Sequence, residues 1–263
     1  NEPILGPKFN LVAGMPKMKY LAQDYDLSPY ETVAENVGKF LSNMYPEHKK
    51  NRVLELLQMV EMENFSNTKA QYLSGGQQQR IALAKSLAQE PEVLLLDEPF
   101  SNIDSFRKGA LRRNLFAYLK SKNITTIIAT HDSTDALSFS DETIAMKAGQ
   151  IIEHNLSSYV FLKPKNFYVA SLFGEVNEVS LRYFNPLSDL NIKILLYPHE
   201  LYLAEKSDLQ VVIKENYFKG NGFLIKAATA NKQVIFFENP FLIPINSIVH
   251  LEVDNEIINQ RSI

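Results

Sequence analysis

Residues 73–104 read LSGGQQQRIALAKSLAQEPEVLLLDEPFSNID, and this stretch decides the fold. Its first signal is the Ser-x-x-Gln spacing of Ser74 and Gln77, which predicts a capping box at the start of a helix. Gly75 and Gly76 remove Cβ atoms where the backbone would approach a ligand closely. Free amides at a helix N-terminus favour a phosphate. From these residues alone, a capped helix without any ligand is the simpler alternative.

The second signal is a short apolar run, residues 93–96, which predicts a strand buried on both faces of a parallel sheet. Asp97 and Glu98 follow it, at the end of the strand where open α/β sheets bind their ligands. One carboxylate there can hold Mg²⁺, and the other can orient or deprotonate a water molecule. A solvated acidic turn is the alternative interpretation.

Together, in this order, the segments closely resemble the ABC-type ATPases. The resemblance covers the signature motif (residues 73–77), the Walker B segment (93–98) and the D-loop (101–104). It implies ATP and Mg²⁺ as cofactors, with Glu98 as the general base and Asp97 helping to hold the metal. It also implies that residues 74–77 bind the nucleotide presented by a second subunit, and that Asp104 lies at the dimer interface.

The chain before this stretch fits the same family. A short strand is expected at residues 18–22, and residues 21–25 resemble the Q-loop, which implies that Gln23 contacts Mg²⁺ and the attacking water. Residues 32–62 show two amphipathic helical stripes, which Pro46 interrupts. The first stripe is Val33, Val37, Phe40 and Leu41, and the second is Val53, Leu54, Leu57 and Val60. By resemblance they belong to a helical subdomain, about residues 30–90, with a groove for a helix of a membrane permease.

The chain after this stretch continues the pattern. We expect a helix over residues 105–120 and a β-branched strand over 124–129, which ends at His131. A lone histidine at such a position is more often a hydrogen-bonded structural residue than a catalytic one. In the family, however, the switch histidine follows this strand and contacts the γ-phosphate, and His131 matches it. Residues 141–153 predict two strands around a turn at Gly149 and Gln150.

Beyond Glu175 the sequence changes to short β-rich runs separated by turn residues, which predicts a small all-β, barrel-like domain. Residues 197–200 resemble the Arg-Pro-Glu segment in the accessory β domain (OB/TOBE-like) of importer ATPases, although Tyr197 replaces the usual arginine. The expected fold class is therefore α/β, a partial P-loop NTPase core followed by this β domain. The expected domains are 1–160 for the core, 161–174 for a linker and 175–263 for the β domain.

Composition narrows the function classes. The 263 residues are 45% hydrophobic and 22% charged, with a net charge of −3 and a pI near 6.0, so no basic surface suggests nucleic acid. The absence of cysteine excludes disulfides and thiolate metal sites. No apolar run approaches the ~18 residues of a membrane span, so any membrane link is expected through a partner.

One family motif is missing from these residues. No G-x-x-x-x-G-K-[ST] phosphate loop occurs among the ten glycines, so we expect a fragment that lacks the N-terminal part of the core and has no ATPase activity by itself. By resemblance, that loss leaves an apolar strand edge beside residues 94–96. We therefore expect self-association or lost order at that gap.

The expected function is the ATP-hydrolysing subunit of an ABC importer. The resemblance implies a homodimer or a second ATPase subunit, transmembrane permease subunits, an indirect link to a substrate-binding protein, and a peripheral position on the cytoplasmic face of the plasma membrane. Nucleic acid is not an expected partner. Two alternatives remain open: a non-catalytic regulatory module that binds a ligand through its β domain, and a soluble ABC ATPase outside transport.

Overall fold

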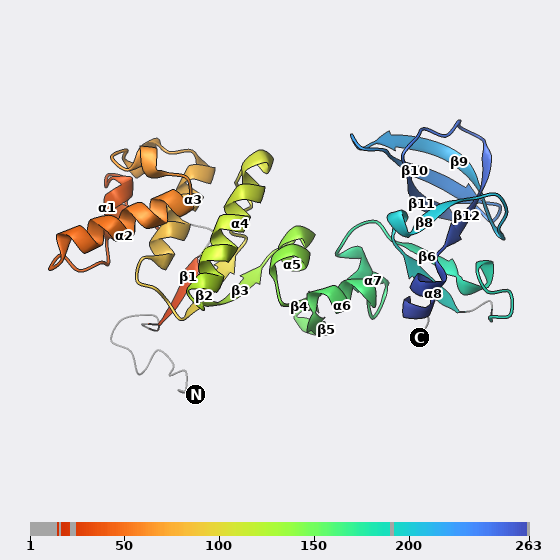
Figure 1. The fold of residues 1–263 in the computed structure, drawn as a ribbon, viewed down its shortest axis with the longest axis horizontal. Helices are drawn as coiled ribbons and strands as arrows, with labels where there is room; N and C mark the ends of the chain where they lie inside the picture. The colour runs from red at the N-terminus through yellow and green to blue at the C-terminus, as the bar shows by residue number, and fades with distance from the viewer. Residues whose placement is uncertain (1–14, 16, 22–24, 190–191, 262–263) are drawn as a thin grey trace. The chain divides into compact units, whose positions relative to one another are not determined.

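The computed structural model describes residue 15 and residues 17–21, 25–189 and 192–261. The chain divides into two compact units, Asn1–His131 and Asp132–Ile263, which are described separately below (Figure 1). This division falls before the expected core boundary at residue 160. The predicted domain limits, 1–160, 161–174 and 175–263, stay a prediction.

The first unit contains a three-stranded parallel sheet in the order β1-β2-β3. The strands are β1 (Met18–Leu21), β2 (Val93–Asp97) and β3 (Thr125–Ala129). Leu94 of β2 lies opposite Lys19 on one side and Thr126 on the other. The predicted gap beside residues 94–96 is therefore wrong, and self-association or lost order there loses its basis. Among the strands that the structure describes, β2 is central, and β1 and β3 are the outer strands.

The two faces of this sheet differ in burial. Leu94 and Leu96 are fully buried against the helices, whereas Val93 and Leu95 on the opposite face are only half-buried. On that second face, Tyr20 and Ile127 flank Leu95 in register, and they are 60% and 61% exposed. The prediction of a strand buried on both faces is thus wrong for the second face, because apolar composition alone does not show what covers a strand.

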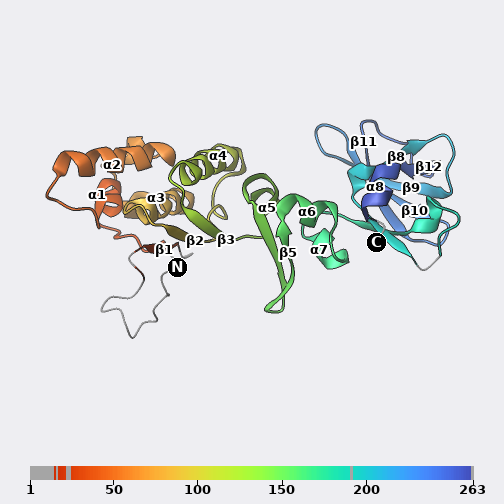
Figure 2. The ribbon, with the colours of Figure 1, turned by 60° about the horizontal axis from the view of Figure 1, so that its bottom comes forward.

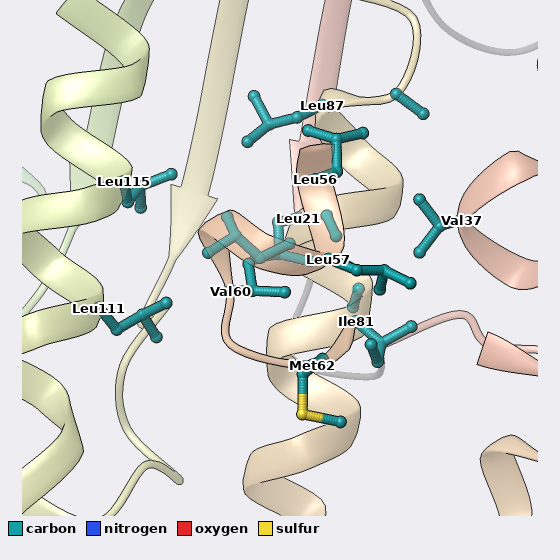
Figure 3. Close-up of a cluster of buried hydrophobic side chains, with 14 of the residues drawn as sticks. Leu21, Val37, Leu56, Leu57, Val60, Met62, Ile81, Leu87, Leu111 and Leu115 are labelled. Atoms are coloured by element: carbon teal, nitrogen blue, oxygen red, sulfur yellow. The ribbon is translucent and has the colours of Figure 1, made fainter. Parts of the chain in front are cut away.

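Four helices form the rest of the core of the first unit. They are α1 (Val33–Gly38), α2 (Pro46–Met59), α3 (Gly75–Leu87) and α4 (Ser105–Ser121), with short 3-10 turns at Glu63–Phe65 and Ala70–Tyr72. Figure 3 shows side chains from all four helices and from β1 meeting in one cluster, which includes Val37, Leu57, Ile81 and Leu115. Pro46 begins α2 at a position where its missing N–H costs nothing.

The predicted apolar stripe on α2 is partly wrong. Leu54 is 45% exposed, whereas Leu56, which the stripe omits, is fully buried. Arg52 on the same helix is also buried. Its guanidinium donates hydrogen bonds to the carbonyls of Leu87 (2.7 Å) and Ala88 (3.3 Å), which satisfies the C-terminal end of α3. Arg52 therefore fixes α2 to the far end of the helix that Ser74 begins.

The second unit opens with helix α5 (Ser133–Phe139) and the antiparallel hairpin of β4 (Glu142–Lys147) and β5 (Gln150–Leu156). The hairpin confirms the predicted turn, where Gly149 has φ +77°. Helices α6 (Ser157–Leu162) and α7 (Phe167–Ser171) follow. Val160 and Val169 from these helices share a small core with Ala145 of β4.

The remaining elements form the small β domain. A five-stranded antiparallel sheet has the order β11-β10-β9-β12-β8, with strands at the following bounds: β8 (Leu201–Ala204), β9 (Leu209–Phe218), β10 (Phe223–Thr229), β11 (Val234–Asn239) and β12 (Ile248–Val253). A second sheet pairs β6 (Asn177–Ser180) with β7 (Lys193–Leu196). Two 3-10 turns (Leu181–Tyr183 and Pro198–Glu200) and helix α8 (Asn255–Arg261) complete the domain. Figure 2 shows α8 with the strands β8 to β12.

A buried amide joins the two sheets of the β domain. The Asn177 side chain donates to the carbonyl of Phe236 and accepts from its N–H, at 2.7 Å in both cases, so it imitates a paired strand residue. The α/β class and the small β domain are confirmed. In the part of the domain that the structure describes, the pairing stays open at β11 and β8, so the resemblance to a barrel does not extend to full closure.

Helix length and polarity bear on the membrane question. Over the residues that the structure describes, no helix has both the length and the apolar content needed to cross a bilayer.

Candidate functional site

The N-terminus of α3 is built as the sequence predicts. The Ser74 hydroxyl accepts from the Gln77 N–H at 3.3 Å, and the Gln77 side chain accepts from the Ser74 N–H at 2.9 Å, which is a complete capping box. Ser74 and Gly75 are exposed, so the first turn of the helix faces outward. This places the positive end of the α3 dipole at an accessible surface.

The two glycines of this turn have different surroundings. A Cβ built on Gly75 meets no atom within 4 Å, which leaves open space for a ligand to approach. A Cβ built on Gly76 would instead lie inside 3.0 Å of the carbonyl oxygen of Asn102. The sequence interpretation, close approach to a ligand, therefore fits Gly75. Gly76 is required by the neighbouring backbone of the same chain.

The second part of the site is the carboxyl end of β2. Asp97 is the last residue of the strand, and the Tyr20 hydroxyl of β1 lies 3.4 Å from its Oδ2. Glu98 follows with φ +49°, a left-handed conformation that is uncommon outside glycine. Its N–H donates to the carbonyl of Ala129 at 2.9 Å, which continues the pairing with β3. The backbone therefore turns sharply at Glu98 while its position at the sheet edge stays fixed.

Glu98 and His131 meet at this edge. Oε1 of Glu98 lies 2.6 Å from Nδ1 of His131, although the two residues are 33 positions apart in the sequence. The Glu98 side chain is 22% exposed and that of His131 is 80% exposed. The pair therefore combines a sheltered carboxylate with an imidazole that reaches toward solvent. This arrangement can accept a proton from a water molecule and hold the carboxylate in one orientation.

The segment after Glu98 contains the expected D-loop. Asp104 is exposed and begins α4 as its N-cap residue, where its main-chain carbonyl accepts from the N–H groups of Arg107 and Lys108. Ile103 beside it is buried, which anchors the loop to the core. The exposed carboxylate of Asp104 is therefore available at the surface of the first unit.

Sequence reasoning missed one residue that connects these parts. Gln79, one turn after Ser74 on α3, is 3% exposed, and its Nε2 donates to the carbonyl of Glu98 at 2.8 Å. The run of three glutamines at positions 77–79 was the available signal, because a polar side chain on the inner face of a helix needs a partner. A hydrogen bond thus joins helix α3 directly to the turn at Glu98 within one chain.

Among the predicted site residues, Asp97, Glu98 and His131 lie together at the carboxyl end of the sheet, and residues 74–77 begin the adjacent helix. Gln23, predicted as a metal contact, lies outside the described residues. Within those residues, no group of three or more acidic, histidine or cysteine side chains has the arrangement of a metal site. Asp97 offers the oxygen ligand that Mg²⁺ prefers, and this ion usually takes only one or two protein carboxylates, with phosphate and water completing its coordination.

Comparison with known proteins shows what this chain is similar to. The family profile described as "ABC transporter" matches residues 14–101, which include the signature and Walker B segments. The "Fe(3+) ions import ATP-binding protein FbpC" of Mannheimia succiniciproducens is 32% identical over 241 residues, covering 83% of this chain and 68% of that protein. The "Spermidine/putrescine import ATP-binding protein PotA" of Pasteurella multocida is 40% identical over 157 residues, covering 59% and 42%. The chain thus spans between two fifths and about two thirds of the length of these relatives.

A solved structure shares the fold. The cbiO1 protein of Clostridium perfringens, described as part of the ABC transporter complex cbiONQ, is 30% identical with a TM-score of 0.50, over 56% of this chain and 59% of that one. The expectation of an ABC-type ATPase is confirmed at the level of the family. On these matches, the chain belongs to the ABC transporter family, among its importer-type ATP-binding subunits.

Proposed function

We propose that this chain is part of the ATP-hydrolysing subunit of an ABC importer, in which ATP binding and hydrolysis drive solute uptake through a membrane permease. The observation that carries the proposal is the contact of Glu98 with His131, 2.6 Å apart at the carboxyl end of β2. Such edges of open α/β sheets are where ligands bind. The names of the relatives, importer ATP-binding proteins, support the same reading.

The chemistry of the proposal assigns a role to each side chain. Glu98 accepts a proton from the water molecule as its oxygen bonds to the γ-phosphorus, so the carboxylate becomes a carboxyl group. The bond between the γ-phosphorus and the β–γ bridging oxygen breaks, and ADP and phosphate are the products. His131 holds the carboxylate in place and presents its remaining ring nitrogen to the γ-phosphate. When bound, Mg²⁺ neutralises phosphate charge, and Asp97 is the described residue that would hold it, with Gln23 as the second proposed contact.

The N-terminus of α3 serves a different nucleotide in this proposal. Ser74, Gly75, Gly76 and Gln77 bind the phosphates of an ATP held by a second subunit, because an exposed helix N-terminus carries free N–H groups and positive dipole charge. Asp104 then lies at the interface between the subunits. Two subunits, identical or related, would enclose two ATP molecules and reopen after hydrolysis.

The partners follow from the same proposal. The helical part of the first unit would contact a permease at the cytoplasmic face of the plasma membrane, and a substrate-binding protein would act indirectly. The named relatives differ in their solute, Fe(3+) ions in one case and spermidine or putrescine in the other. The permease and binding protein therefore set the solute in this proposal, and the ATPase site does not.

The test is Glu98→Gln in the protein expressed from the whole reading frame that encodes these residues, provided with its permease. We expect the variant to bind ATP, to keep the closed dimer and to lose steady phosphate release. Glu92→Gln is the matched control, since Glu92 lies before the opposite end of β2 in an exposed ion pair with Lys17. Normal hydrolysis by Glu98→Gln would refute the base assignment. Residues 1–263 alone are expected to show no ATPase activity, because they contain no phosphate loop.

The same preparation separates the alternatives. An importer subunit is expected to co-purify with a membrane protein, whereas a soluble ABC ATPase outside transport would co-purify with nucleic acid or ribosomes. A regulatory module would bind neither ATP nor permease tightly, and its β domain would bind a small ligand instead. Co-purification with nucleic acid or ribosomes, or a small ligand bound by the β domain in place of ATP and permease, would refute the importer proposal.

A further inference from the structure

The Gln79 side chain occupies a buried position between α3 and the turn after β2. Its Nε2 donates to the Glu98 carbonyl at 2.8 Å and lies 3.3 Å from the Ser101 hydroxyl oxygen. Its Oε1 accepts from the Asn102 N–H at 3.1 Å. Both ends of one amide are therefore used by the segment that contains Glu98 and opens the D-loop. We call this set of contacts the Gln79 clamp.

A second, independent contact fixes the same two elements. The α3 backbone at Gly76 lies so close to the Asn102 carbonyl that no Cβ fits between them. Three residues before Gln79, the helix thus touches the segment directly, and the clamp closes on it from the next turn. The beginning of α3 and residues 98–102 therefore move together, because displacing one breaks three hydrogen bonds and a close backbone contact.

This rigid connection has a consequence for the proposed sandwich of two subunits. In that arrangement, residues 74–77 contact the nucleotide held by the second subunit, while Glu98 acts on the nucleotide held by its own subunit. The Gln79 clamp therefore joins parts of two different nucleotide sites. We infer that Gln79 is a positioning residue that couples the two sites, an inference that rests on the proposed function. When residues 74–77 bind the nucleotide of the second subunit, Gln79 fixes the position of Glu98 at the nucleotide of its own subunit.

The chemistry of the side chain explains why an amide is needed. Only a group with both a donor and an acceptor satisfies the Glu98 carbonyl and the Asn102 N–H at once. The neighbouring Arg80 is also buried, but its guanidinium bonds the carbonyls of Val60 and Glu61 within the helical part. The role is thus specific to position 79 and is not shared by the polar residues beside it.

The control comes from the adjacent residue. The Gln78 amide donates to the carbonyls of Ala70 and Leu73, at 3.3 and 3.2 Å, both of which precede α3. Gln78→Leu therefore removes the same chemical group from the same helix, with two donated bonds, and leaves the segment of residues 98–102 untouched. A general loss of helix stability affects both variants, whereas loss of the clamp affects only Gln79→Leu.

The experiment measures the rate of ATP hydrolysis against ATP concentration for the protein expressed from the whole reading frame, together with its permease. In wild type, two positively coupled sites give a Hill coefficient above 1, with 2, the number of sites, as its upper limit. Gln79→Leu is expected to lower it to about 1 and to raise the half-saturating ATP concentration several-fold, because the second site no longer gains affinity from the first. It is also expected to reduce kcat about tenfold, since a displaced Glu98 loses part of the ~10²–10⁴-fold contribution of a general base. Gln78→Leu is expected to keep the wild-type Hill coefficient.

Amide hydrogen exchange on residues 1–263 supplies a second measurement. The Asn102 N–H is expected to lose protection in Gln79→Leu and to keep it in Gln78→Leu. Where Gln79→Leu does not fold, Gln79→Glu replaces it, because a carboxylate keeps the acceptor and loses the donor to Glu98. Unchanged cooperativity in the Gln79 variant, or equal loss in both variants, would overturn the inference. A wild type that binds no ATP would overturn the proposed function itself, a result that needs no variant.

Discussion

Gly75 and Gly76 provide a sharp test of the packing at the start of α3. We predict that Gly76→Ala destabilises the first unit, whereas Gly75→Ala does not. The new methyl group at position 76 would enter the space of the Asn102 carbonyl, closer than 3.0 Å. Overpacking of this kind costs about 1–3 kcal/mol. Alanine regains up to about 1 kcal/mol through its helix propensity, so the net loss is about 0–2 kcal/mol, with a central value near 1 kcal/mol.

At position 75 only the favourable term remains, because the added methyl group meets no atom within 4 Å. The stability difference between the two alanine variants is therefore about 2 kcal/mol, which moves a urea midpoint by roughly 1 M. The chain has no tryptophan, so helix content by far-UV circular dichroism is the suitable probe. Equal midpoints for the two variants would refute the argument, since they would show that the Asn102 backbone moves aside freely.

Two further predictions concern the β domain. Arg261→Met is expected to lower the free energy of unfolding of this domain by about 3–5 kcal/mol, because the buried Glu200 carboxylate would lose its partner. The side chains of Arg261 and Glu200 in this ion pair are only 3% and 7% exposed. Thermal unfolding measures the loss, and adding Glu200→Gln to the variant should recover much of it. Burial raises the pKa of Tyr197 to about 12 from 10.0, so the contribution of the neutral phenol to stability is fully present below pH 10 and is lost, to a limit of about 3 kcal/mol, as the pH rises through 12. Tyr197→Phe should unfold with a flatter pH dependence over that interval, and an unchanged dependence would contradict the assignment.

Much of the fold was readable from local patterns. Ser74 and Gln77 predicted the capping box because both partners of that motif lie within four residues. The hairpin at Gly149 and most strands of the β domain were equally predictable, since turn chemistry and alternation act over short distances. Glu98 and His131 could be placed at one sheet edge, because consecutive parallel strands end on the same side.

The rest depended on contacts between distant parts of the chain. Nothing near Leu94 reveals that β1 and β3 flank it, so the prediction of a gap beside residues 94–96 is wrong. Arg52 and Gln79 are polar residues in amphipathic helices, and their partners, Ala88 and Glu98, lie 36 and 19 residues away. Local sequence specifies that such a side chain is polar, whereas only the assembled fold specifies which carbonyl it satisfies.

The left-handed backbone of Glu98 has a consequence for how this protein can change. For any residue other than glycine, that conformation costs roughly 1–2 kcal/mol. Replacement by glycine would remove the expense and would also erase the carboxylate. At this position, therefore, glycine would favour the stability of the fold, whereas glutamate is needed for the proposed catalysis. In related proteins that no longer hydrolyse nucleotide, we expect glycine at this position more often than glutamate.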